Sequence, residues 1–389
     1  MRRPLHKAHW LRRLLFMAII APFVLLWGEV FTRVLLPQNV DAKMNIFASD
    51  PIVGFTFKPN AQTYEKGSEY NTLYQINSNG LRDREYGEKK ENTFRVLLLG
   101  DSFSVSHGLT IEESLSRQME KALQGLTDSN GRPKKIEVVN TAVGGYSPYN
   151  YWKAYQRWAP VFKPDAVLIG LSPDDYECDN ENMRYVIEYG ETLSVLKEGQ
   201  EPGKRRGITI KRVRKWLSWN SEFYILMRNF IYYNDIVRSI SLQINPGGIE
   251  DDSQLQLYMV SKQEKTHQAW SKSFSFLTKL KKETSADGVD MILVSIPLKL
   301  EIDSEQYQQV LVTKGLKKEQ IDLDQQLREI SIFCRKENIA LLDPRPSMRE
   351  HHVKTPCYFV LDGHWNAEGV RVAACSIARQ WRDLGLPPF

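Results

Sequence analysis

Two short segments, far apart in the sequence, carry the residue types of a nucleophile and its base. Ser102 follows four apolar residues, Val96 to Leu99, which are typical of a strand buried on both faces. Asp362 lies two residues before His364, at the predicted start of the last helix. An aspartate in this place orients an imidazole and stabilises its protonated form, while the other ring nitrogen takes a proton from a serine hydroxyl. The pattern therefore predicts a triad of Ser102, His364 and Asp362.

Groups that could stabilise an oxyanion are predicted after the second and third strands. The paired glycines Gly144 and Gly145 let a backbone N–H approach a negatively charged oxygen with no side chain in the way. The third strand is followed by a Ser-Pro-Asp-Asp run that holds Asp174 and Asp175. Because the carboxyl ends of parallel strands meet at one edge of a sheet, we expect these groups to lie beside Ser102.

Each motif also has a purely structural explanation. Serine and aspartate are common in turns and at helix starts, so Asp101 and Ser102 could simply cap a helix. A short Asp-x-His also occurs often by chance. We interpret Asp101 as a turn and cap residue, whereas a loop-orienting role for Asp175 rests on analogy alone. The specific signal is the order in which the motifs follow successive strands.

The strands and helices that must position these residues form an alternating pattern. Such a pattern predicts a doubly wound, three-layer α/β/α domain with a parallel sheet. The predicted strands are 96–99, 136–140, 166–171, 289–296 and 339–343, and the predicted helices are 111–125, 148–159, 318–337 and 367–384.

The composition is that of an ordinary globular protein. The chain has 389 residues, of which 42% are hydrophobic and 25% are charged, and its formal net charge is +5. These values exclude a disordered or fibrous chain. Much of the positive charge lies at the N-terminus and in one central cluster, so it does not indicate a nucleic-acid partner.

The N-terminal segment has the features of a membrane anchor. A basic tip, residues 1–13, precedes an uncharged run, 14–28, which spans about 22 Å as a helix. A hydrocarbon core is about 30 Å thick, so the anchor is extended to residues 14–36, with Glu29 and Arg33 near the far interface. We expect an uncleaved, single-pass signal anchor with the N-terminus in the cytoplasm and the rest exported. A cleaved signal peptide and a buried core helix are the alternatives.

The rest of the chain divides into an arm, a main domain and an insertion. Residues 37–93 are loop-rich and are expected to form an arm that packs on the main domain, which we place at 94–180 and 286–389. Residues 181–285 interrupt the alternation and combine a basic cluster with aromatic residues. This insertion is predicted to be helical. It is either a cap on the domain or a surface for anionic lipid, glycan or, least favoured, nucleic acid.

No cofactor and no metal are predicted. The sequence lacks the Gly-rich nucleotide-binding motifs, and the spacings of His351, His352, Cys357 and His364 match no common structural zinc site.

Among the four cysteines, Cys334 and Cys375 lie in apolar patterns and are predicted to be packed thiols. Cys178 and Cys357 lie close to the motifs above, and a disulfide between them is left open.

The three blocks of residues resemble the SGNH, or GDSL-type, hydrolase superfamily. Gly100-Asp-Ser-Phe103 is similar to its first block, Val143-Gly-Gly-Tyr146 to its second, and Asp362-Gly-His364 to its last. The similarity runs from about Asn77 to the last helix and is to the bacterial membrane-anchored members. The resemblance implies a flavodoxin-like five-stranded sheet and a location in the bacterial inner membrane, with the catalytic domain in the periplasm or outside the cell.

The resemblance also implies a role for each site residue. Ser102 would be the nucleophile, with Asp362 and His364 as the acid and base of the triad. The oxyanion hole would be formed by the N–H groups of Ser102 and Gly145 and by the residue at position 174, with Gly144 in a supporting place.

One position departs from the family pattern. The third block of the family is Gly-x-Asn-Asp, and its asparagine donates to the oxyanion, whereas this chain has Asp174 in that place. An ionised carboxylate repels a developing negative charge, and loss of one such donor costs about 10²- to 10³-fold in rate. A protonated Asp174, a neighbouring donor, or a protein that binds without cleaving would each account for the change.

Three functions are consistent with the sequence. The first is a serine esterase or O-acyltransferase that forms an acyl-enzyme on Ser102. The resemblance implies an acetyl ester of a cell-envelope or extracellular polysaccharide as its substrate and envelope polysaccharide machinery as its partner. The second is a catalytically silent SGNH-like domain that binds polysaccharide or a partner in an envelope complex. The third is a membrane-surface scaffold that uses the basic segment 204–215.

Overall fold

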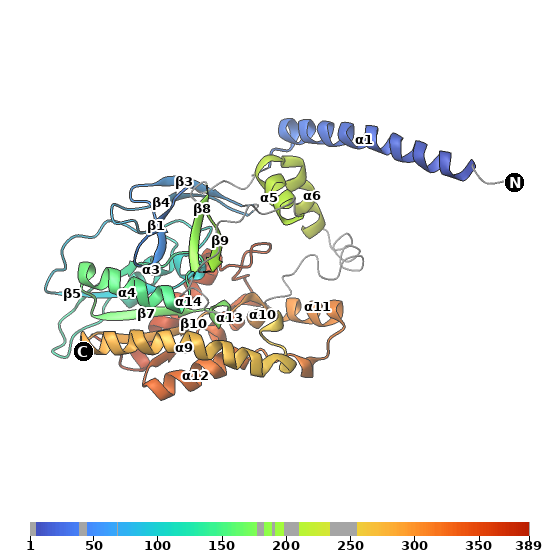
Figure 1. The fold of residues 1–389 in the computed structure, drawn as a ribbon. Coiled ribbons are helices and arrows are strands. Elements are labelled where there is room, and N and C mark those ends of the chain that lie inside the picture. Colours follow the sequence, from blue (N-terminus) through green and yellow to red (C-terminus); the bar gives the residue numbers. More distant parts are fainter. Residues whose placement is uncertain are drawn as a thin grey trace.

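A five-stranded parallel sheet forms the centre of the protein (Figure 1). The structure, a computed structural model, describes residues 5–38, 45–67, 69–176, 183–188, 191–197, 210–233 and 255–388. The strands of the sheet are β5 (Thr93–Leu99), β6 (Lys135–Asn140), β7 (Ala166–Leu171), β10 (Asp290–Ser295) and β11 (Ala340–Leu342). Their order is β11-β10-β7-β5-β6, and every neighbouring pair is parallel. In chain order this is the flavodoxin-like arrangement, so the predicted sheet is confirmed.

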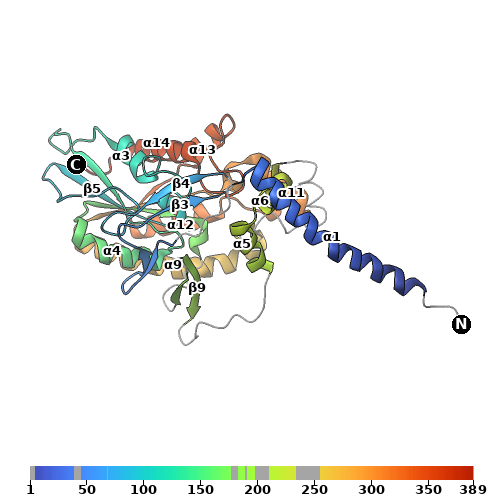
Figure 2. The ribbon, with the colours of Figure 1, turned by 90° about the horizontal axis from the view of Figure 1, so that it is seen from above.

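Helices cover both faces of the sheet and make the predicted three layers (Figure 2). One face carries α3 (Leu115–Leu123), α13 (Arg345–His352) and α14 (Ala367–Asp383), and the other carries α4 (Pro148–Phe162), α9 (Gln263–Ala286) and α12 (Gln325–Glu337). Strand β5 is buried along its whole length, since Val96 and Leu98 face the first core whereas Leu97 and Leu99 face the second. This two-sided burial explains the continuous apolar run in the sequence.

The arm before the sheet contains two antiparallel hairpins. They pair β1 (Phe47–Asp50) with β2 (Gly54–Phe57), and β3 (Gln62–Lys66) with β4 (Asn71–Gln75). Phe55 is buried in the core that also holds α4, and its carbonyl accepts a hydrogen bond from the Tyr146 hydroxyl at 2.6 Å. The first hairpin is therefore packed against the loop that follows β6.

Strands as well as helices occur in the described residues between β7 and β10. Its described part begins with an antiparallel hairpin, β8 (Met183–Glu188) and β9 (Glu191–Lys197), and continues with α5 (Ile210–Asn220) and α6 (Glu222–Tyr233). The boundary expected at residue 285 falls inside α9, which packs on α4 and belongs to the main domain. The many lysines of α9 hide the buried stripe of Trp270, Leu277 and Leu280 in the sequence. Residues 204–209 of the basic segment lie outside the described residues.

Shorter elements complete the fold. They are the helices α2 (Ser102–Val105), α10 (Lys299–Ile302) and α11 (Ser304–Lys314) and the 3₁₀-helices Pro173–Tyr176, Val260–Lys262 and Lys318–Gln320. The predicted helix 111–125 is shorter than expected, because Ser114 caps α3 by accepting from the N–H of Arg117. The predicted helix 318–337 is divided into a 3₁₀ turn and α12.

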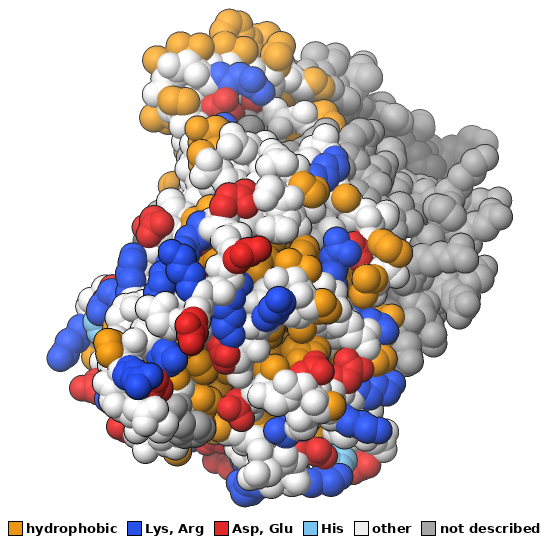
Figure 3. All heavy atoms as spheres, turned by 90° about the vertical axis from the view of Figure 1, so that its left-hand side faces the viewer, with side chains coloured by type: hydrophobic (Ala, Val, Ile, Leu, Met, Phe, Trp, Pro, Cys, Tyr) orange, Lys and Arg blue, Asp and Glu red, His pale blue; other side chains and the backbone are white. Residues whose placement is uncertain are grey.

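The N-terminal helix α1 (Leu5–Leu35) carries many exposed apolar side chains, which gather at the upper end of the molecule in Figure 3. Its Glu29 accepts hydrogen bonds from the Ser221 hydroxyl at 2.7 Å and from the N–H of Phe223 at 3.1 Å, at the start of α6. Arg33 pairs with Glu29 at 2.7 Å. Across the part of the chain that the structure describes, no helix combines the length and the hydropathy needed to cross a bilayer.

The described cysteines are free thiols. Cys334 and Cys357 are buried, and burial raises the pKa of Cys334 to about 12 and that of Cys357 to about 11. The prediction of a packed thiol was right for Cys334 and wrong for Cys375, which is exposed on the outer face of α14. Cys178 lies outside the described residues.

One glycine sets how closely α14 approaches the loop before it. A Cβ on Gly369 would lie 1.9 Å from the carbonyl oxygen of Cys357, which is backbone and cannot swing away. We expect Gly369→Ala to lower the free energy of unfolding by about 3 kcal/mol, because overpacking outweighs the gain of about 1 kcal/mol from replacing a helical glycine. Gly87→Ala is the matched control, since a Cβ there meets no atom within 4 Å. Urea unfolding measures both, and equal stabilities would contradict the close approach.

Candidate active site

Ser102 lies at the carboxyl end of β5, as the first residue of α2. The strand order reverses beside β5, and this is where open α/β sheets bind ligands. Asp101 is the N-cap of α2, and its carboxylate accepts from the N–H of Phe103 at 2.9 Å and from the Ser172 hydroxyl at 2.8 Å. The interpretation of Asp101 as a cap is confirmed. Its side chain also connects the ends of β5 and β7, and burial raises its pKa.

The structure brings the three predicted triad residues together. The Oγ of Ser102 lies 2.7 Å from Nε2 of His364, and Nδ1 of His364 is hydrogen-bonded to Oδ1 of Asp362. The ring of Phe103 packs beside the imidazole of His364 at 4.8 Å between centroids. Asp362 thus holds the ring so that its other nitrogen faces the serine hydroxyl. This arrangement suits transfer of the serine proton to the imidazole.

The Gly-Gly turn lies beside the serine. A Cβ on Gly144 would lie 3.7 Å from the Cβ of Ser102, so the two backbones are neighbours. Gly145 has a φ of +84°, a conformation that residues other than glycine rarely adopt. Val143 closes the turn by donating to the carbonyl of Gly100 at 3.3 Å and accepting from Tyr146 at 3.0 Å. The turn therefore places the backbone of Gly144 next to Ser102, with Gly145 as the following residue.

Asp175 orients the loop that follows β7. Its carboxylate accepts from the hydroxyl of Tyr151 at 2.8 Å and from the N–H of Ser172 at 2.9 Å. Its side chain is buried and contributes to the shape of the loop, in agreement with the prediction. Asp174 belongs to the 3₁₀-helix Pro173–Tyr176, but its side chain lies outside the described part of the structure, so its place in an oxyanion hole stays a prediction.

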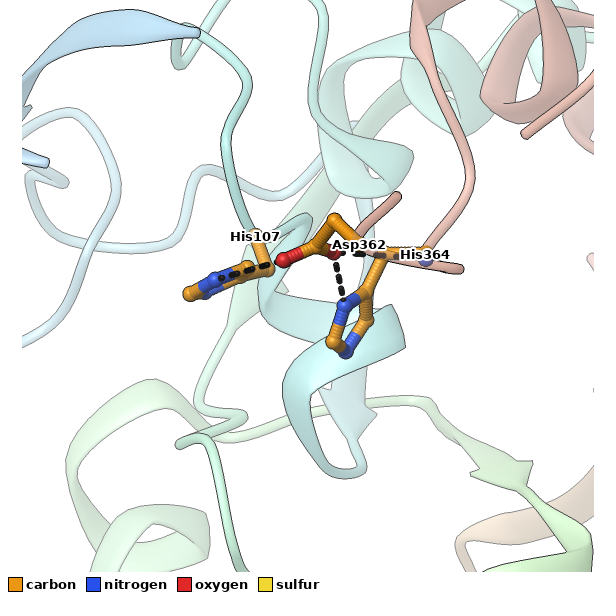
Figure 4. A group of neighbouring side chains, drawn as sticks. All are labelled: His107, Asp362 and His364. Atoms are coloured by element: carbon orange, nitrogen blue, oxygen red, sulfur yellow. Dashed lines mark hydrogen bonds and ion pairs between the residues drawn. The ribbon is translucent and has the colours of Figure 1, made fainter. Parts of the chain in front are cut away.

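Sequence reasoning missed a group of residues behind Asp362. Figure 4 shows His107, Asp362 and His364 lying close together, with nitrogen and oxygen atoms within 4.8 Å of one another. Tyr70 donates from its hydroxyl to Oδ2 of Asp362 at 3.0 Å, and Glu65 pairs with His107 at 2.7 Å. His107 carries a weak signal in the sequence, since it follows the nucleophile by five residues. Glu65 and Tyr70 carry none, because they come from the arm.

The same group could be taken for the ligands of a metal. However, each carboxylate oxygen of Asp362 is already bonded to another member of the group, Oδ1 to His364 and Oδ2 to Tyr70. The donor atoms therefore satisfy one another, as in a network of hydrogen bonds.

This network keeps Asp362 ionised. Burial raises the pKa of Asp362, but the hydrogen bond and charge of His364, the charge of His107 and the hydroxyl of Tyr70 outweigh burial and hold this pKa well below its ordinary range. A carboxylate that stays ionised can stabilise a positive imidazole throughout the neutral pH range.

A cleft of about 1010 Å³ opens beside the serine and the imidazole. Apart from the triad, its walls are formed by α10, α11 and the segment that leads from α13 to His364. Tyr258 and Leu298 contribute apolar surface, and Lys299, Asp303 and Lys354 contribute charges of both signs. A cleft of this size suits a small organic substrate or one end of a larger chain.

The lowered pKa of Asp362 implies that the stability of the protein depends on pH. A group with a depressed folded pKa stabilises the protein above its unfolded pKa of about 3.8, and this contribution is lost as the pH falls toward the folded value. We expect Asp362→Asn to lower the free energy of unfolding by about 1 kcal/mol at pH 7 and by less at pH 3, where the unfolded carboxylate has begun to take up a proton.

Urea unfolding at the two pH values measures this difference. Asp383→Asn, on the exposed end of α14, is the control for removal of one negative charge. An equal loss at both pH values for Asp362→Asn would contradict the account of its ionisation.

The chain matches one family model over a third of its length. Residues 257–388 match the model described as an SGNH hydrolase-like domain, acetyltransferase AlgX. The match includes Asp362 and His364, while Ser102 lies before it. No curated protein matches the chain.

Solved structures give a wider but weaker likeness. A lipase/acylhydrolase from Enterococcus faecalis has a TM-score of 0.38 and 12% identity, covering 76% of this chain and 99% of that one. An acetyl xylan esterase has a TM-score of 0.36 and 12% identity, covering 75% and 100%. The esterase EstA from a Pseudoalteromonas species has a TM-score of 0.35 and 13% identity, covering 74% and 98%.

These TM-scores are low, and the assignment of the fold rests on the strand order given above. The matched range of the family model, 257–388, contains the Asp362-Gly-His364 motif. Residues 257–388 are therefore similar to an SGNH hydrolase-like domain.

Proposed function

We propose that the protein is a serine esterase or O-acyltransferase that forms an acyl-enzyme on Ser102. The observation that carries this proposal is the line of contacts from Oγ of Ser102 to Nε2 of His364 and from Nδ1 of His364 to Asp362. A hydroxyl, an imidazole and a carboxylate in this order form the arrangement of nucleophilic catalysis.

The reaction would take place in two steps that use the same residues. The serine proton moves to Nε2 of His364 while Oγ forms a bond to the carbonyl carbon of an ester. The negative oxygen of the tetrahedral intermediate lies near the amides of Ser102 and Gly145. The intermediate collapses when the ester oxygen leaves with the proton from His364. Water or a sugar hydroxyl then repeats the sequence and releases the acyl group.

The acyl group and its carrier are proposed from the family rather than from the cleft. The matched model names an acetyltransferase, which supports acetyl as the group transferred. The resemblance of the motifs to membrane-anchored bacterial SGNH proteins supports an acylated cell-envelope or extracellular polysaccharide as the substrate. Hydrolysis and transfer differ only in whether water is kept from the acyl-enzyme. The membrane anchor at residues 14–36 and the periplasmic or extracellular location of the catalytic domain remain predictions.

Removal of the nucleophile tests the enzyme directly. We expect Ser102→Ala to reduce acetate release from an acetyl ester by at least about 10³-fold, because the acyl-enzyme can no longer form. Ser129→Ala, in an exposed loop, is the matched control and should keep the wild-type rate. Equal rates for Ser102→Ala and the wild type would reject the proposal.

The second candidate function rests on Asp174. If the domain is silent and binds polysaccharide or a partner, Ser102 should not react with a fluorophosphonate, whereas an active triad should become labelled at this residue. We expect labelling of the wild type and none of Ser102→Ala. We also expect Asp174→Asn to raise kcat by about 10-fold, since the amide can donate to the oxyanion where a carboxylate repels it. A fall in kcat for this variant would show that the carboxylate is needed.

A further inference from the structure

The hairpin of β3 and β4 lies against the segment that carries Asp362. The carboxylate of Glu69 accepts from three successive N–H groups, at 2.6 Å from Val360, 2.7 Å from Leu361 and 3.0 Å from Asp362. The ring of Tyr70 packs on Phe359 with 5.2 Å between centroids. An arm that precedes the sheet thus fixes both the backbone and the neighbouring ring of a loop almost 300 residues later.

Behind the carboxylate of Asp362, a series of contacting polar side chains begins at the same hairpin. The Tyr70 hydroxyl lies 3.0 Å from Oδ2 of Asp362 and 2.9 Å from Nε2 of His107. Nδ1 of His107 lies 2.7 Å from Oε1 of Glu65, whose other oxygen accepts from the N–H of Gly108 at 2.7 Å. The side chain of Glu65 is only 4% exposed. These groups extend the triad by three residues in the direction away from Ser102.

The number of hydrogens available to this series of polar groups determines the charge of His107. A tyrosine hydroxyl has one hydrogen, and if Tyr70 donates it to Asp362, the contact with Nε2 requires a hydrogen on His107. The 2.7 Å contact of Nδ1 with the buried carboxylate of Glu65 is an ion pair when Nδ1 carries a second hydrogen. All contacts are satisfied together when His107 is an imidazolium between two carboxylates and His364 remains free to accept a proton.

We propose that Glu65, Tyr70 and His107 are positioning residues of the reaction, with a protonated His107 directing the Tyr70 hydroxyl onto Asp362. The proposal rests on the esterase or acyltransferase function given above and extends it to the arm. Asp362 is then held from both sides, because His364 occupies one carboxylate oxygen and Tyr70 occupies the other. A carboxylate fixed in this way keeps the imidazole aligned with Ser102 through the reaction.

The surroundings of His107 support this charge. The groups that face it are Glu65 on β3, Tyr70 after the hairpin turn, Asp362 and His364 on the loop before α14, and Arg82 on the arm. Burial lowers the pKa of His107, and so does the charge of Arg82, but the charge and hydrogen bond of Glu65 and the charge of Asp362 outweigh them and raise it.

Arg82 also holds the loop that carries His107. Its guanidinium donates to the carbonyls of Val105 at 2.5 Å and Ser106 at 2.9 Å and lies 4.0 Å over the ring of Tyr74. His107 therefore cannot move away from Asp362 without breaking these contacts.

The sign of the pH effect follows from the raised pKa. Because its pKa is raised, His107 keeps its proton to a higher pH than a free imidazole does and loses it as the pH rises further. The neutral ring then accepts the Tyr70 hydrogen at Nε2, and Oδ2 of Asp362 loses its donor. Catalysis should therefore decrease when His107 loses its proton.

Kinetics of three variants test the positioning role. We expect Tyr70→Phe and His107→Asn each to lower kcat for acetyl-ester hydrolysis by about 10-fold with little change in KM, and the double variant to be no slower than the singles, because the residues act in series. The alkaline decrease in rate seen in the wild type should be absent from His107→Asn. Tyr64→Phe, an exposed tyrosine on the same hairpin, is the control and should match the wild type. A wild-type kcat for Tyr70→Phe, additive losses in the double variant, or an alkaline decrease that persists in His107→Asn would overturn the proposal.

A measurement without substrate separates this proposal from the enzyme function. In nitrogen NMR of the full chain labelled at histidine, we expect His107 to carry hydrogens on both ring nitrogens at pH 7, and Glu65→Gln to lower the pH at which it loses one. A neutral His107 at pH 7 in the wild type would overturn the proposal even if the ester is hydrolysed. Two hydrogens on His107 in a protein that hydrolyses no ester would reject the function and leave the network intact.

Discussion

The active site depends on keeping one partly buried carboxylate ionised, that of Asp362, whose side chain is 23% exposed. A lone carboxylate that loses its hydration takes up a proton, since burial always disfavours the charged form. Asp362 avoids this because proton donors reach both of its oxygens and because two imidazoles lie close to it. If the carboxylate were neutral, it could not stabilise a positive His364, and Ser102 would have no base.

The fold meets this requirement by bringing four distant parts of the chain to one edge of the sheet. β5 delivers Ser102, the turn after β6 delivers Gly144 and Gly145, and the loop before α14 delivers the Asp–His pair. The fourth part is the arm, whose second hairpin contacts that loop through Glu69. Buried polar groups of this kind are stable only as a complete set, because each unpaired member would cost the free energy of its own desolvation. The arm is accordingly part of the site and not a mere connection to the N-terminal helix.

The sequence predicted the parts of this site whose positions follow from local rules. Buried strands appear as continuous apolar runs, and residues at the carboxyl ends of parallel strands converge, so the meeting of Ser102 with Asp362 and His364 could be foreseen. The same rules predicted the five strands within one or two residues at most ends. They failed where burial is not visible in the sequence, as in α9, whose apolar stripe is masked by lysines. Cys375 was misplaced for a related reason, because its apolar neighbours on α14 are buried while its own face is exposed.

The arm residues could not be predicted, because contacts of Glu65 and Tyr70 with residues far along the chain leave no periodic trace. The central claim is that the serine hydroxyl becomes covalently acylated. Mass spectrometry of the protein after brief mixing with an activated acetyl ester tests it most directly. The account predicts one added acetyl group on the peptide that contains Ser102, formed in the wild type and missing when His364 is replaced by alanine. Acetylation of other residues only, or an equal yield without His364, would contradict it.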